Sequence, residues 1–270
     1  MLPWIPLRTI GQHKYGANMK PAFLFIVALL SSNLLFSQTV PDLISEADNY
    51  SIVSFENQKA FDKLLQAEKM EPNNYGVLWR ISRSYVDIGE HLPNKTDADK
   101  EKQLEYYQKA FDYADKAIKA SPDSANGYVR RAIANGRVAL FKGVWSAIDF
   151  VKQVKADCEK AIALDPNNAT AYYVLGRTHM KLCEKSKMIR WPLGLGWANM
   201  EESLKYFDKS IALRPSFILY RLDAARAYNE EDNTAKAKEL LISIAAISKQ
   251  DEDDDQYKKE AKELLEKLSR

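Results

Sequence analysis

The sequence predicts an all-α protein built as an α-solenoid of stacked helix pairs. Gly and Pro are sparse, at ten each in 270 residues, and long stretches rich in Ala, Glu, Lys and Leu are typical of helices. Four similar phrases also recur, each combining the end of a helix, a turn with proline and the start of a new helix. These phrases are AEKMEPNN at 67–74, AIKASPDSA at 117–125, AIALDPNNATAYY at 161–173 and SIALRPSF at 210–217.

Residues 1–38 are expected to be a leader that precedes the helical-repeat domain at 39–270. Met19-Lys20 is followed by about fifteen mostly apolar residues and then by small and polar ones, which is the layout of a secretory signal peptide. The apolar run is short for a transmembrane helix, which needs about 20 residues. We expect cleavage near residues 37–38, no transmembrane anchor afterwards, and an untranslated segment at 1–18 if Met19 is the true start.

The charge of the mature chain gives no case for nucleic-acid binding. The whole sequence carries a formal net charge of +2, and residues 1–38 hold three basic residues and no acidic one, so the net charge after cleavage is −1. A near-neutral chain lacks the basic surface that a nucleic acid attracts. No nucleic-acid partner is therefore predicted.

The first predicted elements are an opening helix pair at 40–70, and from there the prolines set a register. Small residues precede each proline by twelve and by five positions, as is expected where two helices cross closely. The pairs are Ala60 and Ala67 before Pro72, Ala110 and Ala117 before Pro122, Val154 and Ala161 before Pro166, and Ser203 and Ser210 before Pro215. The pattern resembles the tetratricopeptide repeat, a helix–turn–helix unit of 34 residues.

The first helix of each repeat follows the turn. The segments 75–89, 169–182 and 218–228 place aromatic, leucine or small residues at the usual positions of this repeat. The segment 125–138 fits poorly, because Arg131 and Asn135 fall where Leu and Tyr are usual.

The prolines are 50, 44 and 49 residues apart, so three repeats are expected to carry insertions between their two helices, at 90–105, 141–150 and 183–197. The last repeat, at 218–246, has normal length. It is followed by an acidic run at 251–255 and by an amphipathic capping helix that would close the solenoid. The acidic run is expected to favour the start of that helix through the helix dipole.

The third insertion overlaps the stretch KMIRWPLGLGWANM at 187–200 and is unusually apolar. Its large apolar residues are Ile189, Trp191, Leu193, Leu195 and Trp197. Because monomers rarely expose such a patch, we expect Trp191, Leu193 and Trp197 to fold back and pack with FKGVW of the previous insertion. The functional alternative is a hydrophobic lid or a membrane-touching tip beside the concave groove.

The concave groove is the predicted ligand site, because first helices line that face of a repeat solenoid. Its candidate residues are Trp79, Arg83, Arg137, Tyr173, Arg177 and Arg226. Arginines beside aromatic or apolar residues suit an anionic ligand with apolar parts, such as an acidic peptide, a peptide C-terminus or a phospholipid headgroup. In the structural alternative, each arginine pairs with a neighbouring carboxylate such as Asp87 or Glu230 and ties helices together.

No catalytic residues, metal site, disulfide or cofactor are predicted. His13 lies in the leader and His91 in an insertion, and no Cys or carboxylate sits beside His179 at metal spacing. Gly194-Leu-Gly196 lacks a third glycine for a nucleotide loop. Cys158 and Cys183 fall about six residues, or ~9 Å, out of level on antiparallel helices. We therefore expect two free thiols.

Residues 55–246 resemble the regulator of microtubule dynamics family. The resemblance rests on GVWSAIDFVKQVKADCEKAIALDPNNATAYYVLGRTHMKLCE, the apolar insertion after it, and MEESLKYFDKSIALRPSFILYRLDAARAYNEEDNTAKAKELL. It implies an all-helical repeat domain that is not an enzyme. Family members of animals are linked to microtubules and to contacts between mitochondria and endoplasmic reticulum, and one binds phospholipid through its repeats.

The leader departs from those relatives, since it looks like a bacterial export signal, so the microtubule role is not carried over. We expect a non-enzymatic exported scaffold that binds a protein or peptide partner in its concave groove and is periplasmic, envelope-associated or extracellular. The alternative is a lipid-binding or lipid-transfer module that recognises an anionic phospholipid.

Overall fold

The computed structural model describes residues 38–142 and 144–270, of which residues 39–270 form one compact unit. The expected leader therefore lies almost entirely outside the described residues. Within them the chain is helical and contains no strand. None of these helices is both long and apolar enough to cross a bilayer.

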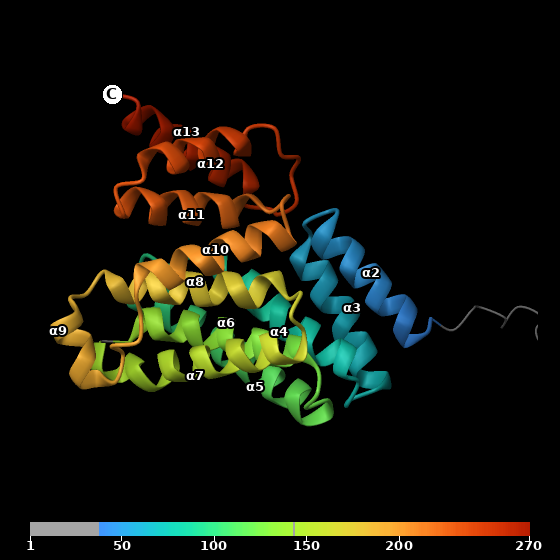
Figure 1. Ribbon diagram of the computed structural model, residues 1–270. Helices are drawn as coiled ribbons and strands as arrows, with labels where there is room; N and C mark the ends of the chain where they lie inside the picture. The colour runs from blue at the N-terminus through green and yellow to red at the C-terminus, as the bar shows by residue number, and fades with distance from the viewer. Residues whose placement is uncertain (1–37, 143) are drawn as a thin grey trace, which may run out of the picture. The chain divides into compact units, whose positions relative to one another are not determined.

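The predicted solenoid of helix pairs is confirmed (Figure 1). Consecutive helices pack as antiparallel pairs, and the last helix covers the end of the stack. The pairs are α2 (Val40–Ile52) with α3 (Asn57–Met70), α4 (Tyr75–Glu90) with α5 (Asp97–Ala120), α6 (Ala125–Phe141) with α7 (Val144–Leu164), α8 (Ala169–Cys183) with α10 (Met200–Leu213), and α11 (Ile218–Glu230) with α12 (Thr234–Ile244). Helix α13 (Asp254–Leu268) is the predicted cap.

Asparagines mark where several of these helices begin. The Asn74 side chain accepts a hydrogen bond from the Val77 backbone N–H at 3.1 Å, and Asn199 accepts one from Glu202 at 2.8 Å. Such caps satisfy backbone donors that have no partner inside the helix. The Asn74 cap places the start of α4 beside the turn at Pro72, where the sequence predicts it, and the Asn199 cap starts α10 after the apolar insertion.

The small residues of the proline register lie at the helix crossings, as predicted. All eight register positions are buried. At two crossings a serine also bonds across the pair: the Ser82 hydroxyl donates to the Ala110 carbonyl and the Ser203 hydroxyl donates to the Gly176 carbonyl, both at 2.7 Å. These bonds satisfy buried hydroxyls that would otherwise destabilise the crossing.

Helix α6 departs from the usual repeat pattern because its polar residues make a different kind of contact. Arg131 donates to the Asp157 carboxylate of α7 at 2.8 and 3.0 Å and to Asp115 of α5 at 2.9 Å. An ion-pair network thus replaces the apolar contact that a leucine would make.

Two of the three predicted insertions do not form separate segments. The extra residues at 90–105 and 141–150 mostly lengthen α5 to 24 residues and α7 to 21. Their composition favours helix, and Thr96 caps α5 by accepting from the Asp99 backbone N–H. The insertion at 183–197 does form its own elements, the short helix α9 (Lys187–Arg190) and the 3₁₀ turn η1 (Trp191–Leu193).

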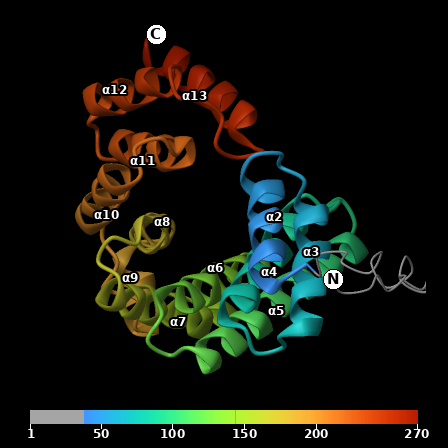
Figure 2. The same cartoon turned by 90° about the vertical axis from the view of Figure 1, so that its right-hand side faces the viewer.

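Within the unit at 39–270 the helix pairs curve until the last elements reach the first (Figure 2). The segment between α12 and α13, residues 245–253, is here called the closing loop. Its Glu252 accepts a hydrogen bond from Asn57 at the start of α3, and its Lys249 lies over the Phe55 ring at 5.3 Å. The concave face therefore lines the inside of a ring of helices (Figure 2).

Candidate binding pocket inside the helical ring

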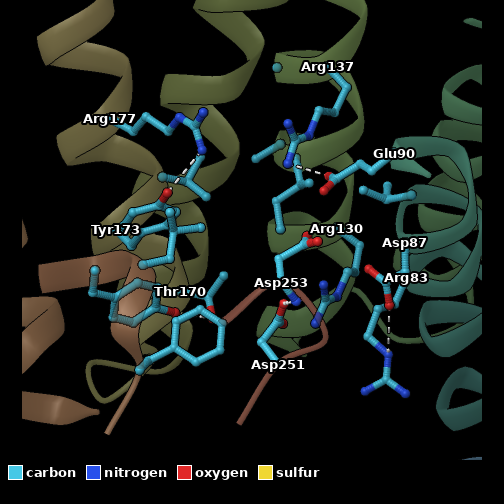
Figure 3. A pocket seen from close by; sticks show the side chains of 18 of the residues that line it. Arg83, Asp87, Glu90, Arg130, Arg137, Thr170, Tyr173, Arg177, Asp251 and Asp253 are labelled. Atoms are coloured by element: carbon cyan, nitrogen blue, oxygen red, sulfur yellow. Dashed lines mark hydrogen bonds and ion pairs between the residues drawn. The ribbon is translucent and has the colours of Figure 1, made fainter. Parts of the chain in front are cut away.

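The concave face on the inside of the ring contains a pocket of about 430 Å³, here called the central pocket. Its wall combines α4, α6 and α8 with the turn before α11 and the closing loop (Figure 3). Its charged and aromatic lining residues are Arg83, Asp87, Glu90, His91, Arg130, Arg137, Tyr173, Arg177, Lys181, Arg214, Phe217, Tyr220, Asp251, Glu252, Asp253 and Tyr257. The volume is in the range of pockets that enclose small ligands or a few side chains.

Four of the six predicted groove residues line the central pocket, namely Arg83, Arg137, Tyr173 and Arg177. Trp79 and Arg226 are not among the lining residues. Helix α13 packs against α11 at Arg226, which donates to Asp223 at 2.8 Å and to Glu260 of α13 at 2.6 Å. Arg226 therefore ties the cap to the last repeat.

Trp79 lies beside the pocket arginines. The Arg80 guanidinium is 4.2 Å from the centre of the indole ring, and those of Arg130 and Arg83 are 5.6 and 5.8 Å away. A guanidinium over an indole face is attracted by the ring quadrupole. Trp79 thus positions two arginines that do line the pocket.

Carboxylates pair with the predicted arginines, as the structural alternative supposed. Arg83 of α4 reaches Asp48 of α2 at 3.3 Å, and its Nε is 3.8 Å from Asp87. Arg137 of α6 pairs with Glu90 of α4. These contacts hold neighbouring repeats together while keeping the guanidinium groups at the pocket wall.

Helices α8 and α11 are joined by a similar contact. Arg177 donates to the Tyr173 hydroxyl at 3.0 Å, and this hydroxyl donates to Asp223 of α11 at 2.8 Å. Burial, with Asp223 nearby, raises the pKa of Tyr173 well above its usual range. The tyrosine is therefore a neutral hydrogen-bonding group near pH 7.

Arg130 is the pocket residue that sequence reasoning missed. In the described part of the chain its Nε has no hydrogen-bond partner and its guanidinium makes no ion pair. Burial, together with the nearby Arg83 charge, lowers the pKa of Arg130 to about 10, so it remains charged near pH 7. A signal was available: Arg130 and Arg137 are seven residues apart, which places both on one helix face.

Two carboxyl groups of α4 share the pocket with these arginines. Burial raises the pKa of Glu90 to about 7, although Arg137 opposes the shift. Burial also raises the pKa of Asp87, against the opposing charge of Arg83. The wall therefore carries charges of both signs in a poorly solvated space, where unmatched charges interact strongly with a ligand.

His91, at the end of α4, meets two acids of the closing loop. Its Nε2 is 2.6 Å from a Glu252 oxygen and 3.1 Å from an Asp253 oxygen, and its Nδ1 is 2.7 Å from the Asp87 carbonyl oxygen. The ligand-type atoms of these three side chains lie within 4.8 Å of one another, a spacing that could hold a metal ion. The separations from Nε2 are hydrogen-bond lengths, and the geometry is that of an ion-pair cluster.

The histidine cluster was missed at the sequence level because its members are about 160 residues apart. Burial lowers the pKa of His91, but the Asp87 carbonyl and the Asp253 and Glu252 carboxylates outweigh it, so the pKa is raised. The acidic run at 251–255 thus has a role that its position before α13 did not predict. It supplies the acids that join the two ends of the ring.

The prediction that Trp191 folds back is wrong, because its side chain is 73% exposed. Ile189 of the same insertion is 53% exposed. Leu195 is buried, and Leu193 and Trp197 are half-buried. Trp197 does fold back, edge-on against His179 at 4.9 Å between ring centres. Part of the expected partner FKGVW, residues 143–145, lies outside the residues whose side chains are described.

Arg190 explains why Trp191 faces outward. Its guanidinium turns inward and donates to the backbone carbonyls of Lys185, Leu195 and Ala198, at 2.9, 3.4 and 2.5 Å. A buried guanidinium needs such acceptors. Because Arg190 occupies the inner side of the turn, the next residue is directed to solvent.

The two cysteines are free thiols in the structure. Burial raises the pKa of Cys158 well above its usual range, and burial also raises that of half-buried Cys183. Neither is activated as a thiolate, which is the reactive form of cysteine.

These features place the chain among the helical-repeat proteins with a tetratricopeptide-like fold. Among solved structures it is similar to a thermophilic tetratricopeptide-repeat protein of Thermus thermophilus, with a TM-score of 0.63 and 13% identity, over 84% of this chain and 99% of that one. At this identity the likeness shows the fold alone.

Residues 43–269 match the family described as regulator of microtubule dynamics protein 1-3, and the chain belongs to that family. It is 28% identical to regulator of microtubule dynamics protein 1 of Mus musculus over 84% of this chain and 74% of that protein. It is 26% identical to protein 3 of Bos taurus, of which it spans about half, 49%. The match extends beyond residues 55–246 to include the opening pair and the capping helix.

Proposed function

We propose that the chain is a non-enzymatic scaffold that binds a peptide segment of a partner protein in the central pocket. The observation that carries the proposal is Arg130, a half-buried cation in the pocket wall whose buried Nε has no hydrogen-bond partner and whose guanidinium has no ion-pair partner among the described residues. An acidic side chain or a C-terminal carboxylate of the peptide would supply the missing anion through paired hydrogen bonds.

An apolar wall supports a ligand that is only partly charged. Ile133 of α6, Val174 of α8, and Phe217 and Leu219 near the start of α11 also line the central pocket. An apolar peptide side chain next to the anionic group would bury surface against this wall. The Tyr173 hydroxyl and the Cys158 thiol are suited to recognition or packing rather than covalent chemistry, because burial keeps both protonated.

A photo-crosslinking experiment tests the proposal. A benzophenone amino acid at Phe217 should crosslink in cell extracts to one defined acidic segment of a partner, identified by mass spectrometry. The same probe at Met70, which is exposed on α3 outside the pocket, should not yield that segment.

The Arg130 variants then separate charge from packing. Arg130→Met should reduce the Phe217 crosslink by roughly tenfold, because a charge-assisted hydrogen bond is lost, and Arg130→Lys should retain part of it. Arg221→Met is the control, since Arg221 bonds Pro215 and Ser243 and does not line the pocket. A crosslink that is unchanged in Arg130→Met contradicts the proposal.

Anionic phospholipid is the competing occupant. Organic extraction and mass spectrometry of the purified protein distinguish it: a stoichiometric phospholipid that is lost in Arg130→Met would replace the peptide proposal. An extract without phospholipid, together with the peptide crosslink, supports the peptide.

We also propose that the chain is exported and acts in the periplasm, at the cell envelope or outside the cell. The support is the signal-like sequence at 19–38. Fractionation and N-terminal mass spectrometry in a Gram-negative host test it. An uncleaved chain confined to the cytosol would overturn the export proposal while leaving the pocket proposal open to its own test.

A further inference from the structure

The turn α9–η1 exposes three large apolar side chains within four consecutive positions. Met188 is 86%, Ile189 53% and Trp191 73% exposed, and together they are here called the apolar tip. Figure 1 shows α9 at the outer edge of the helical unit. Single exposed apolar residues are ordinary, but three large ones within one short turn are typical of an interaction surface.

The apolar tip stands on an ordered base. Arg190, only 7% exposed, bonds three backbone carbonyls beneath the tip, and the Leu195 backbone N–H donates back to the Arg190 carbonyl at 3.0 Å. Gly194 adopts φ +70, which lets the chain turn, and buried Leu195 anchors it in the core. The exposure of the tip is therefore a property of a folded turn.

Lysines surround the apolar tip. Lys185 and Lys187 are exposed and form no ion pair with other described residues. Lys152 of α7 reaches the same turn, since a Cβ added to Gly194 would lie 3.5 Å from its Nζ. The neighbouring acid Glu184 is already paired with Lys181 at 2.5 Å. These three lysines, here called the lysine collar, leave the surroundings of the tip positive.

We propose that the apolar tip and the lysine collar form a docking surface for an anionic lipid bilayer. The tip would enter the interfacial layer, where tryptophan is favoured because one end of its ring system is apolar and the other polar. The collar would contact the negatively charged headgroups. A protruding apolar turn with lysines at its base fits a fluid, negatively charged surface, because a bilayer can accommodate a protrusion without a matching groove.

Vesicle binding tests this inference with the full chain. Cosedimentation is measured with phosphatidylcholine vesicles and with vesicles that also contain phosphatidylserine, at low and at physiological salt. The variant Met188→Ser/Ile189→Ser/Trp191→Ser should bind phosphatidylserine vesicles at least about tenfold more weakly than the unchanged chain, since three apolar side chains no longer leave water. The variant Lys185→Glu/Lys187→Glu should weaken binding to phosphatidylserine vesicles more at low salt than at physiological salt, because salt screens the contacts between lysines and headgroups.

The matched control removes exposed apolar surface elsewhere. Val53 and Ile242 are 67% and 61% exposed away from the tip and outside the central pocket, and Val53→Ser/Ile242→Ser should leave vesicle binding unchanged. The apolar run at 21–36 could bind vesicles by itself, so the readout is the difference between variants of the same chain. Circular dichroism confirms that each variant is folded.

A local measurement gives an independent result. Lipids with brominated acyl chains should quench the part of the fluorescence that is lost in Trp191→Phe. Binding that is equal in the tip variant and in the control variant, or Trp191 fluorescence that the brominated lipids leave unchanged, would sink the proposal. A tip-dependent complex with a purified protein, formed without any vesicle binding, would assign the surface to a protein partner instead.

Discussion

Gly176 lies where α8 crosses α10, with the Phe207 ring directly against its Cα. An added Cβ would lie 3.1 Å from Phe207 Cδ1 and 3.2 Å from the Ser203 carbonyl oxygen. Both neighbours are fully buried, so neither can move away easily. At the residue scale, the repeat therefore depends on the absence of a side chain at this position, which the sequence pattern correctly marks as glycine.

Gly176→Ala should lower the free energy of unfolding by about 1–3 kcal/mol, because the crossing becomes overpacked. Gly136→Ala is the matched change in α6, where an added Cβ meets nothing within 4 Å. It should raise stability by about 0.5–1 kcal/mol through the better helix propensity of alanine. Urea unfolding followed by circular dichroism measures both, and equal effects in the two variants would refute the crossing argument.

Helix α6 shows at the scale of the element how a departure from the repeat pattern is stabilised. Its Arg131 lies between Asp115 of α5 and Asp157 of α7, and the Asp157 side chain is only 3% exposed. A buried carboxylate requires a partner, whereas the same two helices could instead have packed through apolar side chains. The poor fit of α6 is thus a local exchange of one kind of contact for another, with the helix itself unchanged.

Arg131→Met should cost about 3–5 kcal/mol, since it leaves the Asp157 charge buried with only Gln153 as a neutral donor, at 2.8 Å. Adding Asp157→Asn should recover part of that loss, because the uncompensated charge is removed. A double-mutant cycle by chemical unfolding gives the coupling between the two residues. Additive effects of the two substitutions would show that the ion pair contributes nothing specific.

At the scale of the whole molecule, the closing loop converts a curved stack of repeats into a ring. The loop is held by Asn57 and by the His91 cluster, and it supplies Asp251, Glu252 and Asp253 to the pocket wall. Access to the central pocket therefore depends on contacts between the two ends of the unit. These contacts are partly exposed and charged, so they are weaker than the helix crossings.

The closing loop should open more often as the pH rises. His91 has a raised pKa in the folded state, so its contribution to stability is complete below the unfolded value near 6.5 and is lost as pH rises through the folded value. Glu90, with a raised pKa of about 7, acts in the same direction, because the folded state favours its protonated form. Asp87, Glu252 and Asp253 face the histidine and remain its partners.

Hydrogen exchange at residues 245–253, corrected for intrinsic rates, should be faster at about pH 8 than at about pH 6. His91→Gln should remove most of this difference, and Glu90→Gln serves to subtract the contribution of the pocket carboxyl group. Exchange that is independent of pH in the unchanged chain would contradict a histidine-dependent closure.

Local pattern was enough to predict the helix pairs, because a helix and its crossing depend on residues a few positions apart. Ala60, Ala117 and Ser203 lie at their predicted crossings, and four predicted groove residues line the central pocket. The dependence of these predictions on nearby residues alone also explains why Arg226 and Trp191 lie elsewhere than predicted. Arg226 bonds Glu260 of α13, a helix that follows it by about thirty residues. Trp191 faces outward because the neighbouring Arg190 turns inward and bonds three backbone carbonyls.

The sequence by itself therefore determined the repeat fold, the order of the pairs and the concave face on which charged residues gather. Only the tertiary structure decided that this face lines the inside of a ring, that Arg130 is left without an ion-pair partner among the described residues, and that the apolar tip is exposed. Each of these depends on contacts between segments far apart in the chain, or on which of several neighbouring polar side chains forms the available hydrogen bonds and ion pairs. Helical periodicity predicts the helix face on which a residue lies. The residues that it contacts across that face depend on how the helix pairs curve into the ring.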